Sequence, residues 1–102
     1  MIVRLDADGA VVLDADDCAG VHLETPLDED GLRTALQATG TGTLGHGARF
    51  AVLDLGVLRT RARLVASAPD WQRRWEEMVA AAGERLTDDG LGIRVPVERP
   101  PA

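Results

Sequence analysis

Short runs of apolar and β-branched residues open the chain, and acidic turns separate them. Residues 2–5 and 10–13 form two such runs, and Asp8 and Gly9 lie between them. Because Asp and Gly tolerate the positive φ that a tight turn needs, this pattern predicts a β-hairpin. A third short strand is expected over residues 20–24.

A helix is predicted from Thr25 to Gly40. Thr25 can cap it, Pro26 suits the first helical position, and Asp28 places a favourable charge in the first turn. An apolar stripe follows at helical spacing, and Gly40 is a typical helix end.

A second, strongly amphipathic helix is predicted after Ser67. Ser67 is its expected cap, with Pro69 and Asp70 in the first turn. Its apolar positions lie on one stripe, which should supply the largest block of the core. The members of this stripe are Trp71, Trp75, Met78, Val79, Ala82 and Leu86.

Between these helices the pattern is less regular. Residues 39–47 carry four glycines and predict a mobile loop, and residues 48–53 predict a central strand. Residues 55–66 fit a helix capped by Asp54, but they also fit a strand in which three arginines alternate outward. The helix is favoured because it gives the better core face.

The last strand is expected over residues 93–97. Pro96 restricts it to a sheet edge or to a place where no ladder bond is needed. Together these elements predict an α+β fold: an antiparallel sheet of four to six strands with two or three helices packed on one face. Residues 1–98 should form a single domain, because a chain of 102 residues is enough for one core but not for two. Residues 99–102 are expected to be a frayed tail.

Charge is unevenly distributed along the chain. The formal net charge is −6, and all 11 basic residues are arginine. Residues 1–31 hold nine acidic residues and one arginine, whereas residues 49–75 hold six arginines and two aspartates. The negative net charge disfavours nucleic acid as a partner, because binding to phosphates needs positive charge. The segregation favours a homodimer, or docking on a protein partner, through opposite charges.

Several classes of protein are disfavoured by composition. No apolar run is long enough to cross a membrane, and the first residues lack the apolar core of a secretory signal. The single cysteine, Cys18, excludes an internal disulfide. We therefore expect no membrane partner and a cytoplasmic location, and the alanine-rich, lysine-free composition is typical of a bacterium with a GC-rich genome.

No motif in the sequence identifies a catalytic or cofactor site. Imidazole and carboxylate groups carry general acid–base chemistry. The weak candidates for such a role are His22, Glu24, His46 and Asp54. Cys18 and the two histidines could hold zinc in principle, but nothing in their spacing brings them together. The acidic turns fit no calcium-loop register, and the glycine-rich segment precedes a strand rather than a helix, so neither a metal nor a phosphate-bearing cofactor is expected.

The remaining candidates point to protein interaction. Arginine and tryptophan carry much of the binding energy at interfaces, although tryptophans at helical spacing also fit a core. The candidates for contact are Arg59, Arg63, Trp71 and Trp75. We therefore expect a non-catalytic interaction or regulatory module. The alternative is a small enzyme or small-molecule-binding protein with a pocket between sheet and helices.

Overall fold

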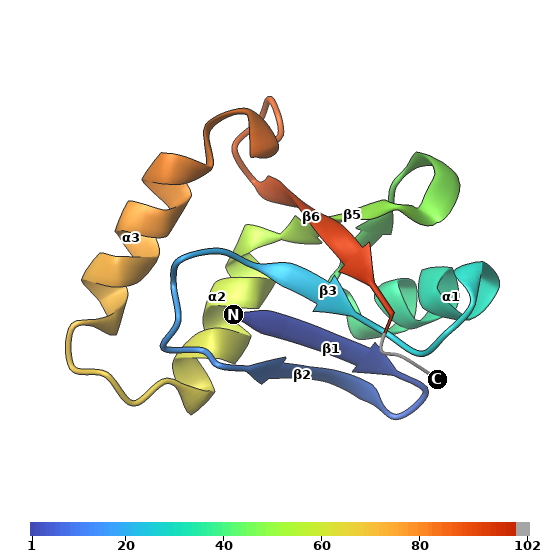
Figure 1. The fold of residues 1–102 in the computed structure, drawn as a ribbon, viewed down its shortest axis with the longest axis horizontal. Coiled ribbons are helices and arrows are strands. Elements are labelled where there is room, and N and C mark those ends of the chain that lie inside the picture. Colours follow the sequence, from blue (N-terminus) through green and yellow to red (C-terminus); the bar gives the residue numbers. More distant parts are fainter. Residues whose placement is uncertain (100–102) are drawn as a thin grey trace.

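Six strands and three α-helices make up residues 1–99, the part of the chain that the computed structural model describes (Figure 1). The strands are β1 (Ile2–Asp6), β2 (Gly9–Leu13), β3 (His22–Glu24), β4 (Gly42–Leu44), β5 (Phe50–Asp54) and β6 (Gly92–Glu98). The α-helices are α1 (Glu29–Thr39), α2 (Leu55–Val65) and α3 (Trp71–Ala82), and two short 3-10 turns are η1 (His46–Ala48) and η2 (Gly83–Arg85). The α+β prediction is confirmed. Residues 100–102, expected as part of a frayed tail, and the side chain of His46 lie outside the described part.

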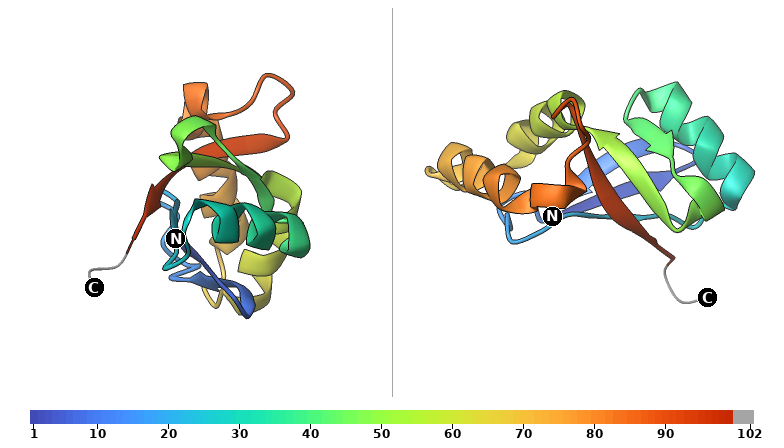
Figure 2. Two further views of the ribbon diagram at one scale, coloured as in Figure 1. Left: turned by 90° about the vertical axis from the view of Figure 1, so that its right-hand side faces the viewer. Right: turned by 90° about the horizontal axis from the view of Figure 1, so that it is seen from above.

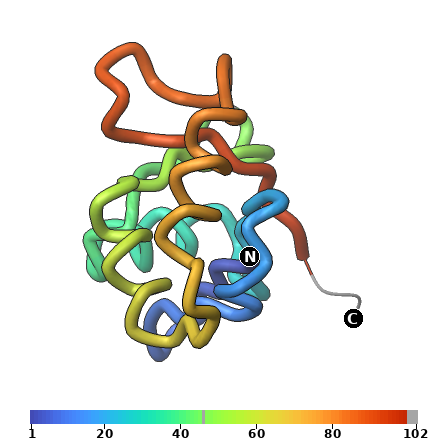
Figure 3. Tube along the Cα trace, turned by 90° about the vertical axis from the view of Figure 1, so that its left-hand side faces the viewer, coloured from blue at the N-terminus to red at the C-terminus, as the bar shows by residue number. Residues whose placement is uncertain are grey.

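One face of the sheet carries the core, and the other faces solvent. Along β1, β5 and β6, buried side chains alternate with exposed or half-buried ones, as in strands with one covered face. Helices α1 and α2 cover the buried face (Figure 2), whereas α3 lies beside residues 14–20 at one end of the sheet (Figure 3). Among residues 1–99, no helix has the length and the apolar run that crossing a bilayer requires.

The sheet is mixed, so the prediction of an antiparallel sheet is wrong. Its strand order is β2-β1-β3-β6-β5-β4, and β3 is parallel to both of its neighbours. Strand β2 runs back along one edge of β1, and residues 14–21 then carry the chain to the other edge, so β3 runs in the same direction as β1. The alternation of apolar residues reports the buried face of a strand but not the direction of its neighbours, and therefore could not predict this.

The last strand lies inside the sheet rather than at its edge. β6 pairs with β5 over five residues and with β3 only at its end, from Val97 onward. The N–H of Val97 donates to the carbonyl of Arg49 at 3.0 Å, so the nitrogen of Pro96 points away from β5. Because the pairing with β3 begins one residue later, the missing N–H of Pro96 removes no ladder bond. The second of the two options predicted for this proline is the observed one.

Helix α1 begins three residues later than the sequence predicts. Thr25 still belongs to the sheet, because its N–H donates to the carbonyl of Glu98 at 3.0 Å. Asp28 is the actual cap, and its carboxylate accepts the N–H of Gly31 at 2.8 Å. The predicted end at Gly40 is confirmed, with a left-handed φ of 65°.

Helix α3 is shorter than predicted at both ends. Ser67 does not cap it, because the hydroxyl and the N–H of Ser67 both donate to the carboxylate of Asp16. The helix therefore begins at Trp71. It ends at Ala82, before a glycine with positive φ, and Leu86 instead forms an isolated bridge with Ile93.

Residues 55–65 form a helix, so the favoured prediction for this segment is confirmed. Asp54 caps α2 by accepting the N–H of Val57 at 2.9 Å, and the helix buries its own residues Leu58 and Ala62. The preceding glycine-rich segment contains β4 rather than a loop alone. Gly42 lies so close to β5 that an added Cβ would overlap the carbonyl of Val52, which explains the need for glycine there.

Candidate functional site

Three of the predicted catalytic candidates, His22, Glu24 and Asp54, are not gathered in one place. His22 and Glu24 lie on the open face of β3, where His22 Nε2 is 3.3 Å from Glu98 Oε2. Glu24 pairs with Glu98 at one end of β6, and Asp54 pairs with Gly92 at the other end. These two ends of β6 are six residue steps apart, a distance of about 20 Å along the strand. Asp54 has a structural role as the cap of α2.

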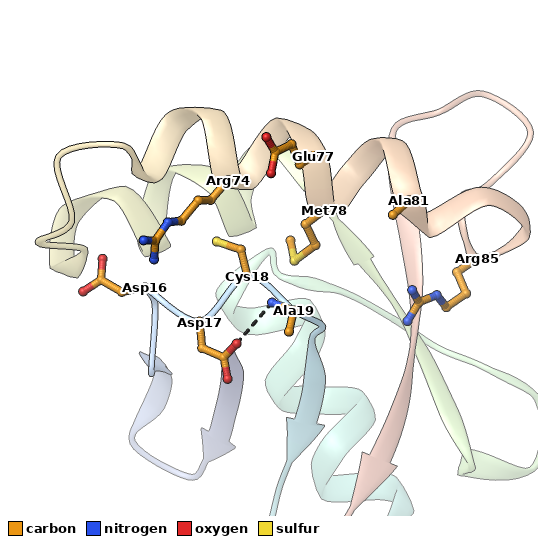
Figure 4. Close-up of a pocket in the computed structure, with 9 residues that line it drawn as sticks. All are labelled: Asp16, Asp17, Cys18, Ala19, Arg74, Glu77, Met78, Ala81 and Arg85. Atoms are coloured by element: carbon orange, nitrogen blue, oxygen red, sulfur yellow. Dashed lines mark hydrogen bonds between the residues drawn. The ribbon is translucent and has the colours of Figure 1, made fainter.

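A groove of about 450 Å³ lies between residues 14–20 and α3 (Figure 4). Three carboxylates and two guanidinium groups surround an apolar floor, so its charge is nearly balanced. The residues that line it are Asp16, Asp17, Cys18, Ala19, Arg74, Glu77, Met78, Ala81 and Arg85. Figure 4 shows Cys18 between the loop and the helix, with Arg74 on one side and Met78 on the other.

Neither the thiol of this groove nor the carboxylate that accepts most hydrogen bonds is arranged for catalysis. Burial raises the pKa of the Cys18 thiol, whereas a nucleophilic cysteine needs a lowered one. The carboxylate of Asp16 accepts the N–H of Ala68 at 2.9 Å, and this bond is the main cause that lowers the pKa of Asp16. Asp16 therefore remains ionised and holds the loop to the start of α3.

A metal centre is not apparent in the described residues. Within residues 1–99, leaving aside the side chain of His46, no three histidine, cysteine, aspartate or glutamate side chains gather in a way that could hold a metal ion. Cys18 lines the groove beside α3, whereas His22 contacts Glu98 on the open face of the sheet. The chemistry that these residues offer is ionic and apolar contact.

The two tryptophans belong to the core. Trp71 and Trp75 are 4% and 5% exposed, and their stacked rings have centroids 5.6 Å apart. The indole N–H of Trp71 donates to the carbonyl of Ala15 at 2.7 Å. This pair fixes α3 to residues 14–20 and leaves little aromatic surface for a partner. Of the predicted contact residues, only Arg59 and Arg63 are exposed.

The outer side of α2 presents those two arginines together with an exposed leucine. Arg59, Thr60, Arg63 and Leu64, here termed the α2 face, border a surface cavity of about 400 Å³. Leu64 is 81% exposed. Reasoning from the sequence missed Leu64, although a leucine outside the apolar stripe of its own helix was an available signal. A hydrogen bond to α3 orients Arg59, because the guanidinium of Arg59 donates to Gln72 Oε1 at 2.8 Å.

The arginines of α2 have no carboxylate partner within residues 1–99. Arg61, the third of them, donates to the carbonyl of Ala10 on the edge of β2 at 3.2 Å. The arginines that form ion pairs in the described residues are Arg33, Arg73 and Arg74, all on α1 or α3. The α2 face is therefore a local positive surface on a molecule whose net charge is −6.

Neither a family model, nor a curated protein, nor a solved structure matches this chain. Its function is therefore inferred from its own residues and contacts.

Proposed function

We propose that this chain is a non-catalytic protein-interaction module that binds an acidic protein surface through the α2 face. The observation that carries the proposal is the pair Arg59 and Arg63, which lack a carboxylate partner in residues 1–99 and lie beside the exposed Leu64. The planar fork of arginine binds a carboxylate through two parallel hydrogen bonds. Binding would also remove the apolar surface of Leu64 from water.

An acidic protein surface fits the charges better than a nucleic acid does. The net charge of −6 repels a polyanion as a whole molecule. At distances within a Debye length, about 8 Å at physiological salt, the guanidinium groups of α2 still attract individual carboxylates. A folded partner with a small acidic patch meets both conditions.

The alternative of a small enzyme has weaker support. Catalysis would need an acid, a base or a nucleophile that converge on one cavity. Glu24 and Asp54 pair with opposite ends of β6, and burial raises the pKa of Cys18. The described residues thus favour a binding surface over a reaction site.

A peptide-binding measurement tests the proposal. The probe is a fluorescent amphipathic helical peptide built from glutamate and leucine, compared with a lysine version of the same peptide and with a DNA duplex. We expect the glutamate peptide to bind best. Its affinity should fall by about tenfold or more in the double variant Arg59→Glu/Arg63→Glu, because charge-assisted hydrogen bonds to the peptide are lost.

The matched control is Arg4→Glu/Arg94→Glu, which makes the same change in net charge at two exposed positions on the open face of the sheet. This control should retain most of the affinity for the glutamate peptide. Equal losses in the two double variants, or tighter binding of the DNA duplex than of the peptide, would overturn the proposal.

A further inference from the structure

We infer that the acidic partner is a second copy of this chain, in which Leu64 of each copy enters a groove between α1 and the β1–β2 hairpin of the other. This inference rests on the proposed function, because the α2 face supplies one half of the contact. The groove supplies the other half.

The groove beside α1 is apolar and lined by small side chains. Its volume is about 450 Å³. Ala7 of the hairpin turn forms one wall, and the other residues that the contact would use are Leu27, Gly31, Thr34, Ala35 and Ala38. Leu27 and Ala35 also pack against the core, so the fold fixes the floor of the groove. A leucine side chain that entered it would bury apolar surface on both partners.

One carboxylate lines this groove, and two others are next to lining residues along the chain. Asp30 lines it, Asp8 follows Ala7 in the hairpin turn, and Glu29 opens α1. Arg33 lies 3.3 Å from Glu29 and 3.5 Å from Asp30, which leaves the group with a net negative charge. An apolar groove among carboxylates and an exposed leucine beside arginines are complementary in both charge and polarity.

The positions of the two surfaces allow a two-fold dimer. Helices α1 and α2 cover the same face of the sheet (Figure 2), so the exposed sides of both helices point away from the sheet in the same general direction. When two copies meet with these helical layers face to face, α2 of each copy can lie over the groove of the other. Such a dimer contains the contact twice, which doubles the buried area.

Sheet extension is the competing route to a dimer, and both edge strands oppose it. At β2, the guanidinium of Arg61 already donates a hydrogen bond to the carbonyl of Ala10, and an added strand would need this carbonyl as an acceptor. At the other edge, β4 has only three residues, and α1 packs beside it. Contact through the helical layer is therefore the favoured geometry.

A charge-swap experiment tests this inference. By light scattering, the wild-type protein should be a dimer at about 100 μM, and the dimer should weaken as rising salt shortens the Debye length. One variant carries Arg59→Glu and Arg63→Glu, and a second carries Asp8→Arg and Asp30→Arg. In a dimer of either variant alone, groups of like charge face each other at both contacts. The dissociation constant of that dimer should therefore rise by about tenfold or more.

An equimolar mixture of the two variants should regain the dimer. In the mixed pair, one contact has its charges exchanged and the other keeps the wild-type charges, so both are complementary again. Circular dichroism melting curves check that each variant is folded. The control Arg4→Glu/Arg94→Glu, placed on the open face of the sheet, should remain a dimer.

A single substitution keeps the test independent of the charge-swap variants. Leu64→Asp lies at a position that is 81% exposed, so it leaves the monomer folded and should abolish the dimer. A dimer that survives Leu64→Asp, a mixture that stays monomeric, or a wild type that is monomeric at every salt concentration would overturn the inference. If a monomeric wild type still binds the glutamate peptide through Arg59 and Arg63, the proposed function stands with a different acidic partner.

Discussion

Helices α2 and α3 have nearly the same length, 11 and 12 residues, but use arginine in opposite ways. In α3, Arg73 and Arg74 both reach the carboxylate of Asp70, at 3.1 and 2.9 Å, and Arg73 also reaches Glu77. In α2, the described residues provide no carboxylate to any arginine. The difference is local, because α3 has acidic residues three and four positions from its arginines and α2 has none. The charges of α3 are neutralised within the helix, whereas those of α2 remain available to a partner.

The apolar residues of the two helices differ in the same sense. Helix α3 buries its stripe, which consists of Trp71, Trp75, Met78 and Ala82. Helix α2 buries Leu58 and Ala62 but leaves Leu64 and Val65 exposed. Helix α3 therefore serves mainly to stabilise the fold, while α2 both anchors itself and presents a surface. Substitutions in the two helices should separate these roles.

The largest effect is expected from emptying the core beneath α3. Trp75→Ala removes a ring that is 5% exposed and stacked on Trp71. It should lower the free energy of unfolding by about 3–5 kcal/mol, because the loss of buried contact is added to the cost of a cavity. The matched change in α2, Leu64→Ala, should stay within about 0.5 kcal/mol. Urea denaturation followed by far-UV circular dichroism measures both, and an unchanged midpoint for Trp75→Ala would contradict the burial of this ring.

The core face of α3 could be predicted from the sequence because helical periodicity is a local property. The hairpin of β1 and β2 and the caps at Asp54 and Gly40 are local in the same way. The parallel placement of β3 and the interior position of β6 could not be predicted, because they depend on pairings between residues that are distant along the chain. The predicted starts of α1 and α3 were wrong. Asp28 caps α1 in place of Thr25, and the hydroxyl of Ser67 donates to Asp16 instead of capping α3.

The candidate site divides along the same line. That Arg59 and Arg63 form no ion pair within α2 could be predicted, because the arginines of this segment have no acidic neighbours at helical spacing. The groove beside α1 could not, because it combines the hairpin turn at Ala7 with the helix residues Ala35 and Ala38, and only the folded chain brings them together. The spacing of Trp71 and Trp75 fits either a core or a contact surface, and their burial and tertiary contacts show that they belong to the core.

The next effect concerns the starts of the two helices. Asp54→Ala removes the carboxylate that accepts the N–H of Val57, so it should cost about 1 kcal/mol of stability. Asp70 precedes α3 but makes no capping bond, and its carboxylate pairs with exposed arginines instead. Asp70→Ala should therefore cost less, since exposed ion pairs contribute little. Urea midpoints compare the two variants, and a larger loss for Asp70→Ala would reverse this distinction.

A further effect depends on pH and concerns the connection between the two helices. The carboxylate of Asp16 accepts hydrogen bonds from Ser67 and Ala68, and these bonds lower its pKa in the folded state. The folded chain thus binds a proton at the Asp16 carboxylate less tightly than the unfolded chain does. The stabilising contribution is complete above the ordinary carboxyl pKa of about 3.9 and is lost as the pH falls from there through the lowered folded value.

Asp16→Asn should accordingly reduce the loss of stability on going from neutral pH to about pH 3, because the variant has no carboxylate to protonate at this position. Urea midpoints at the two pH values, measured for the wild type and the variant, give this difference. Asp70 and Asp89, whose pKa values are also lowered, remain in both proteins and provide the common background. Parallel pH profiles would show that Asp16 contributes nothing to the acid dependence.

The smallest effect on stability, and the sharpest test of the comparison, comes from giving α2 the internal pairing that α3 has. Thr60→Glu places a carboxylate three residues before Arg63 and next to Arg59, so the stability should change by no more than about 0.5 kcal/mol. Binding of the glutamate peptide should nevertheless weaken several-fold, because the guanidinium groups are then partly neutralised within the helix. Thr60→Gln is the matched control, since it has nearly the same size without the charge and loses the same bond from the Thr60 hydroxyl to the Gly56 carbonyl. If the glutamate and glutamine variants bind the peptide equally, then it is not the uncompensated arginine charge of α2 that a partner recognises, and the contrast between the two helices has no bearing on binding.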